Sequence, residues 1–280
     1  MEELNAKIEA NTEIDADEDK NNAVVDKLSD DTDVDADVDA DADADADANV
    51  GADADFGILR EMMEAGVIYG HKKSKTNPKF KQYIYVTRNG VEIIDLSKTL
   101  SALDRTAEFL KNLIKENKKV LLVAIQPAAK EAVNNLVKEF NFSYINDHWI
   151  GGLLTNLKVL SKRIEYFKET QSNLEKGKFE KYTKKERVMI SRNIDRMKKM
   201  FIGLEDLTRL PDVLFVIDTS IKGHMTAIRE AKIMKIPIIG IIDSDDDPDL
   251  IDYMIPANDH AKTSIEWVVN KIKEKLVANH

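Results

Sequence analysis

The sequence of 280 residues contains no cysteine, and only 6% of its residues are aromatic. The absence of cysteine excludes a disulfide scaffold, a thiolate zinc site, an iron–sulfur cluster and a cysteine nucleophile. No apolar run approaches the roughly 20 residues of a membrane-spanning helix, and the opening segment MEELNAKIEANTEIDADEDK lacks the basic and apolar regions of a signal peptide. We therefore expect a cytoplasmic protein with no membrane partner.

Local motifs for catalysis are also missing. No strand candidate is followed by G-x-G-x-x-G or G-x-x-x-x-G-K, so no phosphate cradle is visible. No two of the five histidines stand four residues apart around a glutamate, as a zinc protease would require. Neither Ser220 nor Ser244 lies in a nucleophile-elbow motif. The sequence therefore predicts that the protein is not an enzyme and has no cofactor, bound metal or small-molecule substrate.

One catalytic alternative stays open. Asp218 follows one buried strand candidate, and the run DSDDDPD (243–249) follows another. The carboxyl ends of parallel strands converge at one edge of a sheet, and carboxylate oxygens are the ligands that hard cations prefer. A magnesium-dependent phosphotransfer or hydrolytic enzyme that uses Asp218 and Asp243 is therefore the alternative, although Asp and Pro also end strands for ordinary turn reasons.

Charge divides the chain into two unequal parts. Residues 1–55 hold 21 Asp plus Glu against 3 Lys, a net of −18, whereas residues 56–280 hold 38 Lys plus Arg against 30 acids, a net of +8. Residues 33–47 are almost pure aspartate alternating with alanine or valine, with nearly nothing bulky to bury. Residues 1–55 are therefore predicted to be a disordered acidic tail, and folded sequence should begin near Phe56.

The rest of the chain alternates continuous apolar strands with helices, which is typical of a parallel sheet covered on both faces. The expected strands are VLLVAI (120–125), FSYI (142–145), VLFVI (213–217) and PIIGII (237–242), with YMIP (253–256) as a short edge strand. The helices between them are expected after Pro127, over residues 222–234 and over residues 261–276. This pattern predicts an α/β fold with a doubly wound, flavodoxin-like or Rossmann-like parallel sheet over residues 56–151 and 203–280.

A hairpin should precede this sheet. Residues 83–86 and 91–94 flank Asn89-Gly90, a dipeptide that supplies the positive backbone angles of a tight turn. A helix over residues 97–117 is expected to follow it.

Residues 152–202 form an insert of a different kind. Apolar residues recur at helical spacing on either side of a polar midpoint that contains Gly177, which predicts two antiparallel helices forming a coiled-coil arm. From residue 156 to 202 the insert holds 14 Lys plus Arg and 6 acids, a net of +8. The positive excess of residues 56–280 therefore resides in this arm, which favours an anionic partner.

A second basic stretch favours the same kind of partner. Residues 71–88, HKKSKTNPKFKQYIYVTR, contain six Lys or Arg and no acid, with aromatic residues in between. Such a segment can meet phosphates and stack on unpaired bases. Tyr83 and Tyr85 are nevertheless expected to belong to the core, and the lysines to contact phosphate.

Six motifs, in this order, resemble the bacterial small-subunit ribosomal protein family numbered two. They are GVIYGH (66–71), NPKF (77–80), RNGVEIIDLSKT (88–99), NDHWIGGLLTN (146–156), LTRLPDVLFVIDTS (207–220) and IPIIGIIDSDDDPDLIDYMIPANDHA (236–261). The resemblance covers about four-fifths of the chain. It implies a parallel α/β domain with an inserted coiled-coil arm, in a structural component of the small (30S) ribosomal subunit. It also implies two kinds of partner: small-subunit ribosomal RNA, and other small-subunit proteins, including the large messenger-binding protein.

Together, the basic stretches and the resemblance predict a set of RNA-binding residues. The basic N-terminal segment contributes His71, Lys72, Lys73, Lys75, Asn77, Lys79, Lys81 and Arg88. The turn that leads into the arm contributes Trp149, Gly151, Gly152, Thr155 and Asn156, with Trp149 equally open to a packing role. The arm contributes Lys158, Lys162, Arg163, Lys184, Lys185, Arg187, Arg192 and Arg196.

The chain departs from the family pattern at three places. Ile125-Gln126-Pro127 replaces the usual Gly-Thr-Lys, and His148 replaces the usual Arg before the Trp, so two cations that the family pattern implies are missing. The acidic tail lies outside the pattern, and two roles for it stay open: a solubilising extension, or a polyanion that competes with RNA. A free RNA-binding regulator outside the ribosome is the remaining alternative for the whole protein.

Overall fold

The structure, a computed structural model, describes residues 56–179 and 181–277. The chain divides into two units, Met1–Asp47 and Ala48–His280, and every described residue belongs to the second. The prediction that residues 1–55 form a disordered tail lies outside the described residues.

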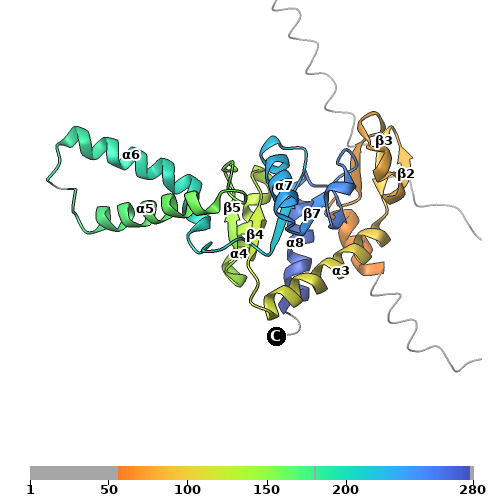
Figure 1. The fold of residues 1–280 in the computed structure, drawn as a ribbon. Coiled ribbons are helices and arrows are strands. Elements are labelled where there is room, and N and C mark those ends of the chain that lie inside the picture. The colour runs from red at the N-terminus through yellow and green to blue at the C-terminus, as the bar shows by residue number, and fades with distance from the viewer. Residues whose placement is uncertain (1–55, 180, 278–280) are drawn as a thin grey trace, which may run out of the picture. The chain divides into compact units, whose positions relative to one another are not determined.

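A five-stranded parallel sheet forms the centre of the second unit (Figure 1). Its strands are β4 (Val120–Val123), β5 (Ser143–Ile145), β6 (Val213–Ile217), β7 (Ile238–Ile242) and β8 (Tyr253–Pro256). Their order in the sheet is β5-β4-β6-β7-β8, and every neighbouring pair is parallel. Numbered along the chain, this is the 2-1-3-4-5 order of the flavodoxin-like doubly wound fold. The predicted α/β fold with a doubly wound parallel sheet is confirmed, and YMIP is the edge strand that the sequence predicted.

Helices cover both faces of this sheet because successive strand residues point to opposite sides. Leu122, Phe215 and Ile241 pack with α3 (Leu96–Lys115), α4 (Lys130–Phe140) and α8 (Lys262–Val277) in one apolar cluster. Their strand neighbours Leu121, Leu214 and Ile242 pack with α7 (Lys222–Met234) in a second cluster on the other face. Burial on both faces explains why the three central strands, β4, β6 and β7, are continuously apolar.

Short one-turn helices and caps set where these elements begin and end. Single 3-10 turns occur at η4 (Pro127–Ala129), η5 (Ile202–Leu204) and η6 (Pro248–Leu250). The Asp95 side chain accepts a hydrogen bond from the Ser97 N–H at the start of α3. Helices α4 and α7 each end at a residue with left-handed backbone angles, Asn141 and Lys235.

A smaller antiparallel sheet precedes the parallel one. It consists of β1 (Tyr69–Lys72), β2 (Ile84–Arg88) and β3 (Val91–Ile94), in the order β1-β3-β2. Strand β3 lies where the sequence placed it. Strand β2 starts later than predicted because Tyr83 ends the 3-10 helix η3 (Pro78–Tyr83), and it runs on to Arg88. The turn is therefore only Asn89-Gly90, with φ values of 51° and 78°.

Strand β1 was not predicted. Its four residues, YGHK, lack the apolar alternation of a half-buried strand, and the 3-10 turn η2 (Lys73–Lys75) follows it directly. The strand forms through pairing with β3, where Tyr69 lies opposite Ile93 and Lys72 opposite Val91.

The inserted segment contains two helices, α5 (Leu157–Glu175) and α6 (Lys184–Phe201), which lie side by side (Figure 1). Their shared buried residues are Leu160, Ile164, Phe167, Ile194 and Phe201. The Phe167 and Phe201 rings lie 6.1 Å apart and join α5 to α6. At the start of α6, Thr183 and Glu186 form a reciprocal capping box. We refer to α5 and α6 as the helix pair.

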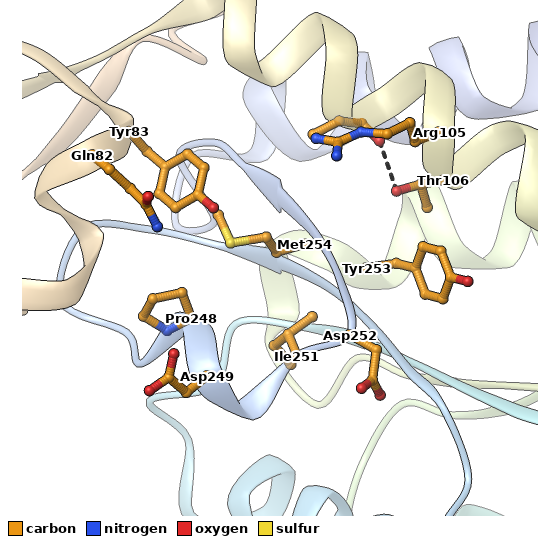
Figure 2. A pocket seen from close by; sticks show the side chains of 11 residues that line it. Gln82, Tyr83, Arg105, Thr106, Pro248, Asp249, Ile251, Asp252, Tyr253 and Met254 are labelled. Atoms are coloured by element: carbon orange, nitrogen blue, oxygen red, sulfur yellow. Dashed lines mark hydrogen bonds between the residues drawn. The ribbon is translucent and has the colours of Figure 1, made fainter.

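A cavity of about 290 Å³ lies beside the edge strand β8 (Figure 2). Arg105 and Thr106 of α3 line one wall, and Pro248, Asp252 and Met254 line others. Within residues 56–179 and 181–277, no helix is both long and apolar enough to cross a membrane.

Candidate functional site

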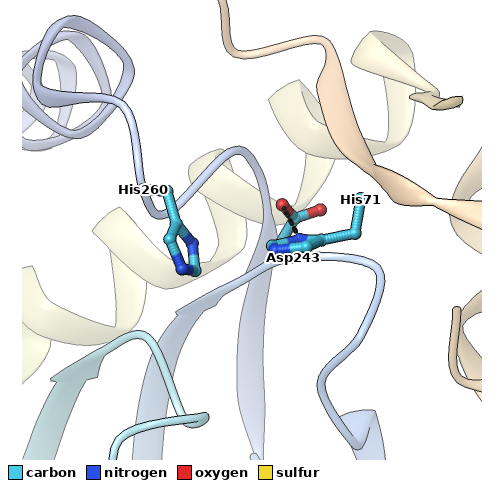
Figure 3. Close-up of side chains that lie close together, drawn as sticks. All are labelled: His71, Asp243 and His260. Atoms are coloured by element: carbon cyan, nitrogen blue, oxygen red, sulfur yellow. Dashed lines mark hydrogen bonds and ion pairs between the residues drawn. The ribbon is translucent and has the colours of Figure 1, made fainter. Parts of the chain in front are cut away.

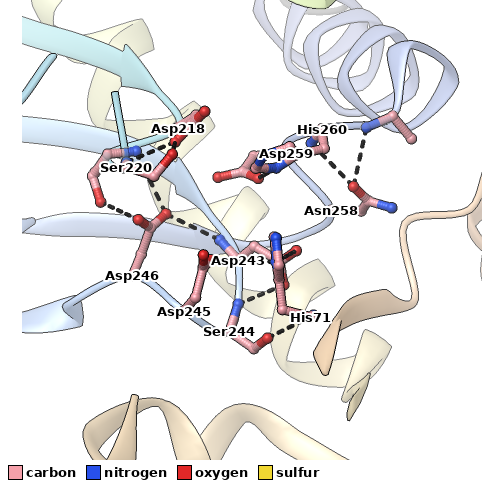
Figure 4. Close-up of polar contacts among 12 residues, drawn as sticks. His71, Asp218, Ser220, Asp243, Ser244, Asp245, Asp246, Asn258, Asp259 and His260 are labelled. Atoms are coloured by element: carbon pink, nitrogen blue, oxygen red, sulfur yellow. Dashed lines mark hydrogen bonds and ion pairs between the residues drawn. The ribbon is translucent and has the colours of Figure 1, made fainter. Parts of the chain in front are cut away.

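The carboxyl ends of β6, β7 and β8 bring a group of ionisable side chains together, and β1 adds one more (Figure 4). We call this group the strand-end cluster. It consists of His71, Asp218, Asp243, Asp245, Asp246, Asp259 and His260. The sequence identified Asp218 and the run from Asp243, because both follow buried strands. It did not identify the other contributors, since β1 was missed and Asp259-His260 follow an edge strand.

His71 connects the antiparallel sheet to this cluster. Its Nδ1 atom lies 2.9 Å from Asp243 Oδ2 and 3.3 Å from Asp245 Oδ1, and its backbone N–H donates to Ser244 Oγ. The hydrogen bond to Asp243 raises the pKa of His71, partly opposed by burial. His71 was predicted to face RNA, but its ring is directed toward these carboxylates.

The innermost carboxyl groups are held in an environment that disfavours their charge. Burial raises the pKa of Asp246 to about 6, and Thr219 is a hydrogen-bonding partner of its side chain. Asp259 is 1% exposed, and burial followed by the neighbouring charges of Asp218 and Asp246 raises its pKa well above the usual range. Its Oδ2 atom is buried and has no hydrogen-bonding partner among the described residues.

Two overlapping sets of side chains in the cluster have the donor atoms that a metal ion requires. They are His71, Asp243 and His260 (Figure 3), and Asp218, Asp259 and His260. Within each set the ligand atoms lie within 4.8 Å of one another. Imidazole nitrogen together with carboxylate oxygen suits a borderline divalent cation rather than the all-oxygen shell of magnesium.

The crevice in which doubly wound proteins usually bind ligands is filled here. That crevice lies between the first and third parallel strands, β4 and β6. His224 is fully buried between their ends, with Nδ1 2.6 Å from the Asp218 carbonyl oxygen and Nε2 accepting from the Ile125 N–H at 2.9 Å. Burial lowers the pKa of His224, so the ring is neutral and structural.

The basic segment, residues 71–88, is exposed at all six of its Lys and Arg side chains. Only Lys79 has ion-pair partners among the described residues: Asp247 at 3.2 Å, and Asp249. Lys79 thus links η3 to η6, and Asn77 caps η3 through its side chain. The cations left facing solvent are Lys72, Lys73, Lys75, Lys81 and Arg88. Tyr83 is partly buried against Phe80, as expected, whereas Tyr85 is 77% exposed, contrary to its assignment to the core.

The turn that leads into the helix pair, residues 149–156, is organised around Glu230 of α7. Trp149 is 3% exposed, and its indole N–H donates to Glu230 at 3.0 Å. Gly152 and Thr155 also donate to this carboxylate. Of the two roles that the sequence left open for Trp149, its burial supports the packing role. Gly151, Thr155 and Asn156 are exposed.

The predicted cations of the helix pair are all exposed. They are Lys158, Lys162, Arg163, Lys184, Lys185, Arg187, Arg192 and Arg196. Within residues 56–179 and 181–277, none of them has a carboxylate within ion-pair distance. On α6, Lys185, Arg192 and Arg196 follow one another at intervals of seven and four, which places them on one side of the helix.

Comparison with known proteins identifies the family. A family model described as Ribosomal protein S2 matches residues 62–278, well over half of the chain. The chain belongs to the ribosomal protein S2 family. The resemblance drawn from the six motifs is thereby confirmed, and so is the prediction that the protein is not an enzyme. The S2 match begins after the acidic stretch, as expected for a tail outside the family pattern.

Curated relatives carry the same name, small ribosomal subunit protein uS2. The protein of Petrotoga mobilis is 39% identical over 219 residues, which cover 78% of this chain and 75% of the relative. The protein of Coprothermobacter proteolyticus is 40% identical, and the match covers 81% of its length. The protein of Thermus thermophilus is 37% identical, and the match covers 85% of its length. The S2 relationship thus spans the sheet and the helix pair alike.

Proposed function

We propose that this protein is a structural constituent of the small (30S) ribosomal subunit in the cytoplasm and supports translation by binding small-subunit ribosomal RNA. The observation that carries this proposal is the set of exposed cations on the helix pair, which have no ion-pair partner among the described residues, in a chain that belongs to the S2 family. We further propose that residues 152–202 act as an antiparallel coiled-coil arm, and that residues 56–151 and 203–280 form the scaffold that carries it.

The cations of the basic segment and of the helix pair bind phosphate in this proposal, and base sequence is of little importance. Folded RNA displays its phosphates and 2′-hydroxyls more readily than its base edges, so recognition depends mainly on shape and charge. The proposed partners are small-subunit ribosomal RNA and neighbouring small-subunit proteins, including the large messenger-binding protein. The filled crevice at His224 supports a scaffold rather than a ligand-binding role for the sheet.

The first test is sedimentation of cell extract through a sucrose gradient after a moderate-salt wash. We expect about one copy of the protein for each small subunit, both in the free-subunit and in the full-ribosome fractions. Absence from those fractions would contradict the proposal. Binding to RNA without a fixed ratio to subunits would instead support a free RNA-binding regulator.

A second test measures affinity for a small-subunit RNA fragment as a function of salt. Because each neutralised phosphate releases counterions, the logarithm of the affinity should fall with the logarithm of salt by about 0.7 to 0.9 for each phosphate contacted. A flat dependence between low and moderate salt would exclude phosphate contacts as the mechanism.

A further inference from the structure

The Glu230 side chain lies where the sheet domain, residues 56–151 and 203–280, meets the turn that leads into the helix pair. It belongs to α7, is 7% exposed, and forms no ion pair among the described residues. A buried carboxylate without a cation is stable only when N–H and O–H groups satisfy its lone pairs.

Among the described residues, the hydrogen-bond donors to Glu230 all come from one short stretch of chain. Oε1 accepts from the Trp149 indole N–H at 3.0 Å and from the Gly152 N–H at 2.8 Å. Oε2 accepts from the Leu154 N–H at 3.0 Å, and from the Thr155 N–H and hydroxyl at 3.4 Å each. A single carboxylate therefore fixes five groups within residues 149–155.

The backbone of this turn is shaped for that arrangement. Gly152 has a φ of +86°, which a residue with a side chain rarely adopts. Leu153 and Leu154, the next two residues, are buried, which anchors the turn on the sheet domain. Helix α5 begins only two residues after Thr155, so the direction of the turn sets the direction in which the helix pair leaves the sheet domain.

We propose that Glu230 is a positioning residue for RNA binding: it holds residues 149–155 in the one conformation that orients the helix pair toward RNA. This inference rests on the proposed function. Glu230 itself contacts no RNA, because its oxygens are buried and already accept five hydrogen bonds. The exposed cations on α5 and α6 contact the RNA, and Glu230 fixes the orientation of these two helices before the RNA binds.

The test replaces the carboxylate with an amide of the same shape. In Glu230→Gln, the side-chain NH2 group faces the N–H groups of either Leu154 and Thr155 or Gly152 and Trp149, so donors oppose donors. If about a tenth of the molecules then keep the productive orientation, the apparent RNA affinity falls about tenfold. The slope of affinity against salt should stay unchanged, because the same phosphates are contacted in the bound state.

The matched control is Glu108→Gln on α3. It makes the same change in charge at an exposed residue that has no ion pair among the described residues.

The orientation of the helix pair relative to the sheet domain can be measured with spin labels, because the chain has no cysteine that would react with them. Spin labels at Glu169→Cys on α5 and Asn270→Cys on α8 give the distance distribution between the helix pair and the sheet domain. We expect a narrow distribution for the parent and the Glu108→Gln variant, and a broad one for Glu230→Gln.

The possible results of these measurements have different meanings for the role of Glu230. An unchanged distance distribution and unchanged affinity in Glu230→Gln would overturn the inference. A lower affinity with a shallower salt slope would also overturn it, since phosphate contacts would then have been lost. If Glu230→Gln does not fold, Thr155→Val, which removes one of the five donors at an exposed position, should show the same broadening to a smaller extent. A parent protein that binds no RNA would refute the proposed function, while the distance measurement would still test the orientation.

Discussion

Asp246 is a buried carboxyl group whose protonation should make the stability of the protein depend on pH. Its folded-state pKa of about 6 lies above the ordinary value of 3.8. The folded protein therefore binds a proton at a pH where the unfolded chain has already released it. This contribution to stability is fully present below about pH 4 and is lost as the pH rises through about 6. The raised pKa of Asp259 acts in the same direction.

We expect the free energy of unfolding to fall between about pH 4 and about pH 7, with Asp246 contributing on the order of 3 kcal/mol. Urea unfolding at several pH values, with a chelator present to keep divalent cations away from the strand-end cluster, measures this. Asp246→Asn should flatten the curve, because the amide does not titrate. Parallel curves for the two proteins would show that this carboxyl group does not control the dependence.

At the scale of elements, exposed cations of the helix pair should contribute to RNA binding but little to the stability of the fold. Lys184, Lys185 and Arg187 are exposed in the first turn of α6, where cations interact unfavourably with the helix dipole. Changing all three to Ala should weaken RNA binding and lower the salt slope by about two to three, if each contacts a phosphate. The melting temperature should change little, because exposed charges contribute little to folding.

The control for this triple variant removes three exposed cations from the sheet domain: Lys115, Lys138 and Arg229. It loses the same charge but should retain the salt slope. A large fall in melting temperature in the α6 variant would instead assign those three residues to the fold, and equal losses of affinity in both variants would indicate a non-specific charge effect.

The antiparallel sheet illustrates what an element's sequence can and cannot predict. Strand β3 and the Asn89-Gly90 turn were predictable, because apolar alternation and positive backbone angles are local properties. Strand β1 was not, because its polar sequence becomes a strand only through pairing with β3. The cluster contacts of His71 follow from that pairing, so they could not be predicted either.

For the molecule as a whole, net charge depends on the acidic stretch. The full chain carries −10, the sum of −18 in residues 1–55 and +8 in residues 56–280. Deleting residues 1–55 should leave the melting temperature unchanged, because the buried core described above lies entirely beyond them. It should also raise the affinity for non-cognate RNA at low salt, because the protein changes from net negative to net positive.

Equilibrium binding to an unrelated RNA, at low and at moderate salt, checks this expectation. The gain in affinity should disappear at moderate salt, where the Debye length is about 8 Å. An affinity that the deletion leaves unchanged at low salt would restrict the acidic stretch to a solubilising role, which the sequence left as the other interpretation.

The sequence by itself determined the order of the parallel strands and the helices between them, the charge of the helix pair, and the family. These follow from apolar periodicity, composition and ordered motifs, which are properties of neighbouring residues. Only the tertiary structure decided which polar side chains have partners. Lys79 pairs with Asp247, His71 with Asp243, and Trp149 with Glu230, each across more than 80 residues of chain. Such pairings depend on how strand ends and turns converge in space, and no local pattern encodes that.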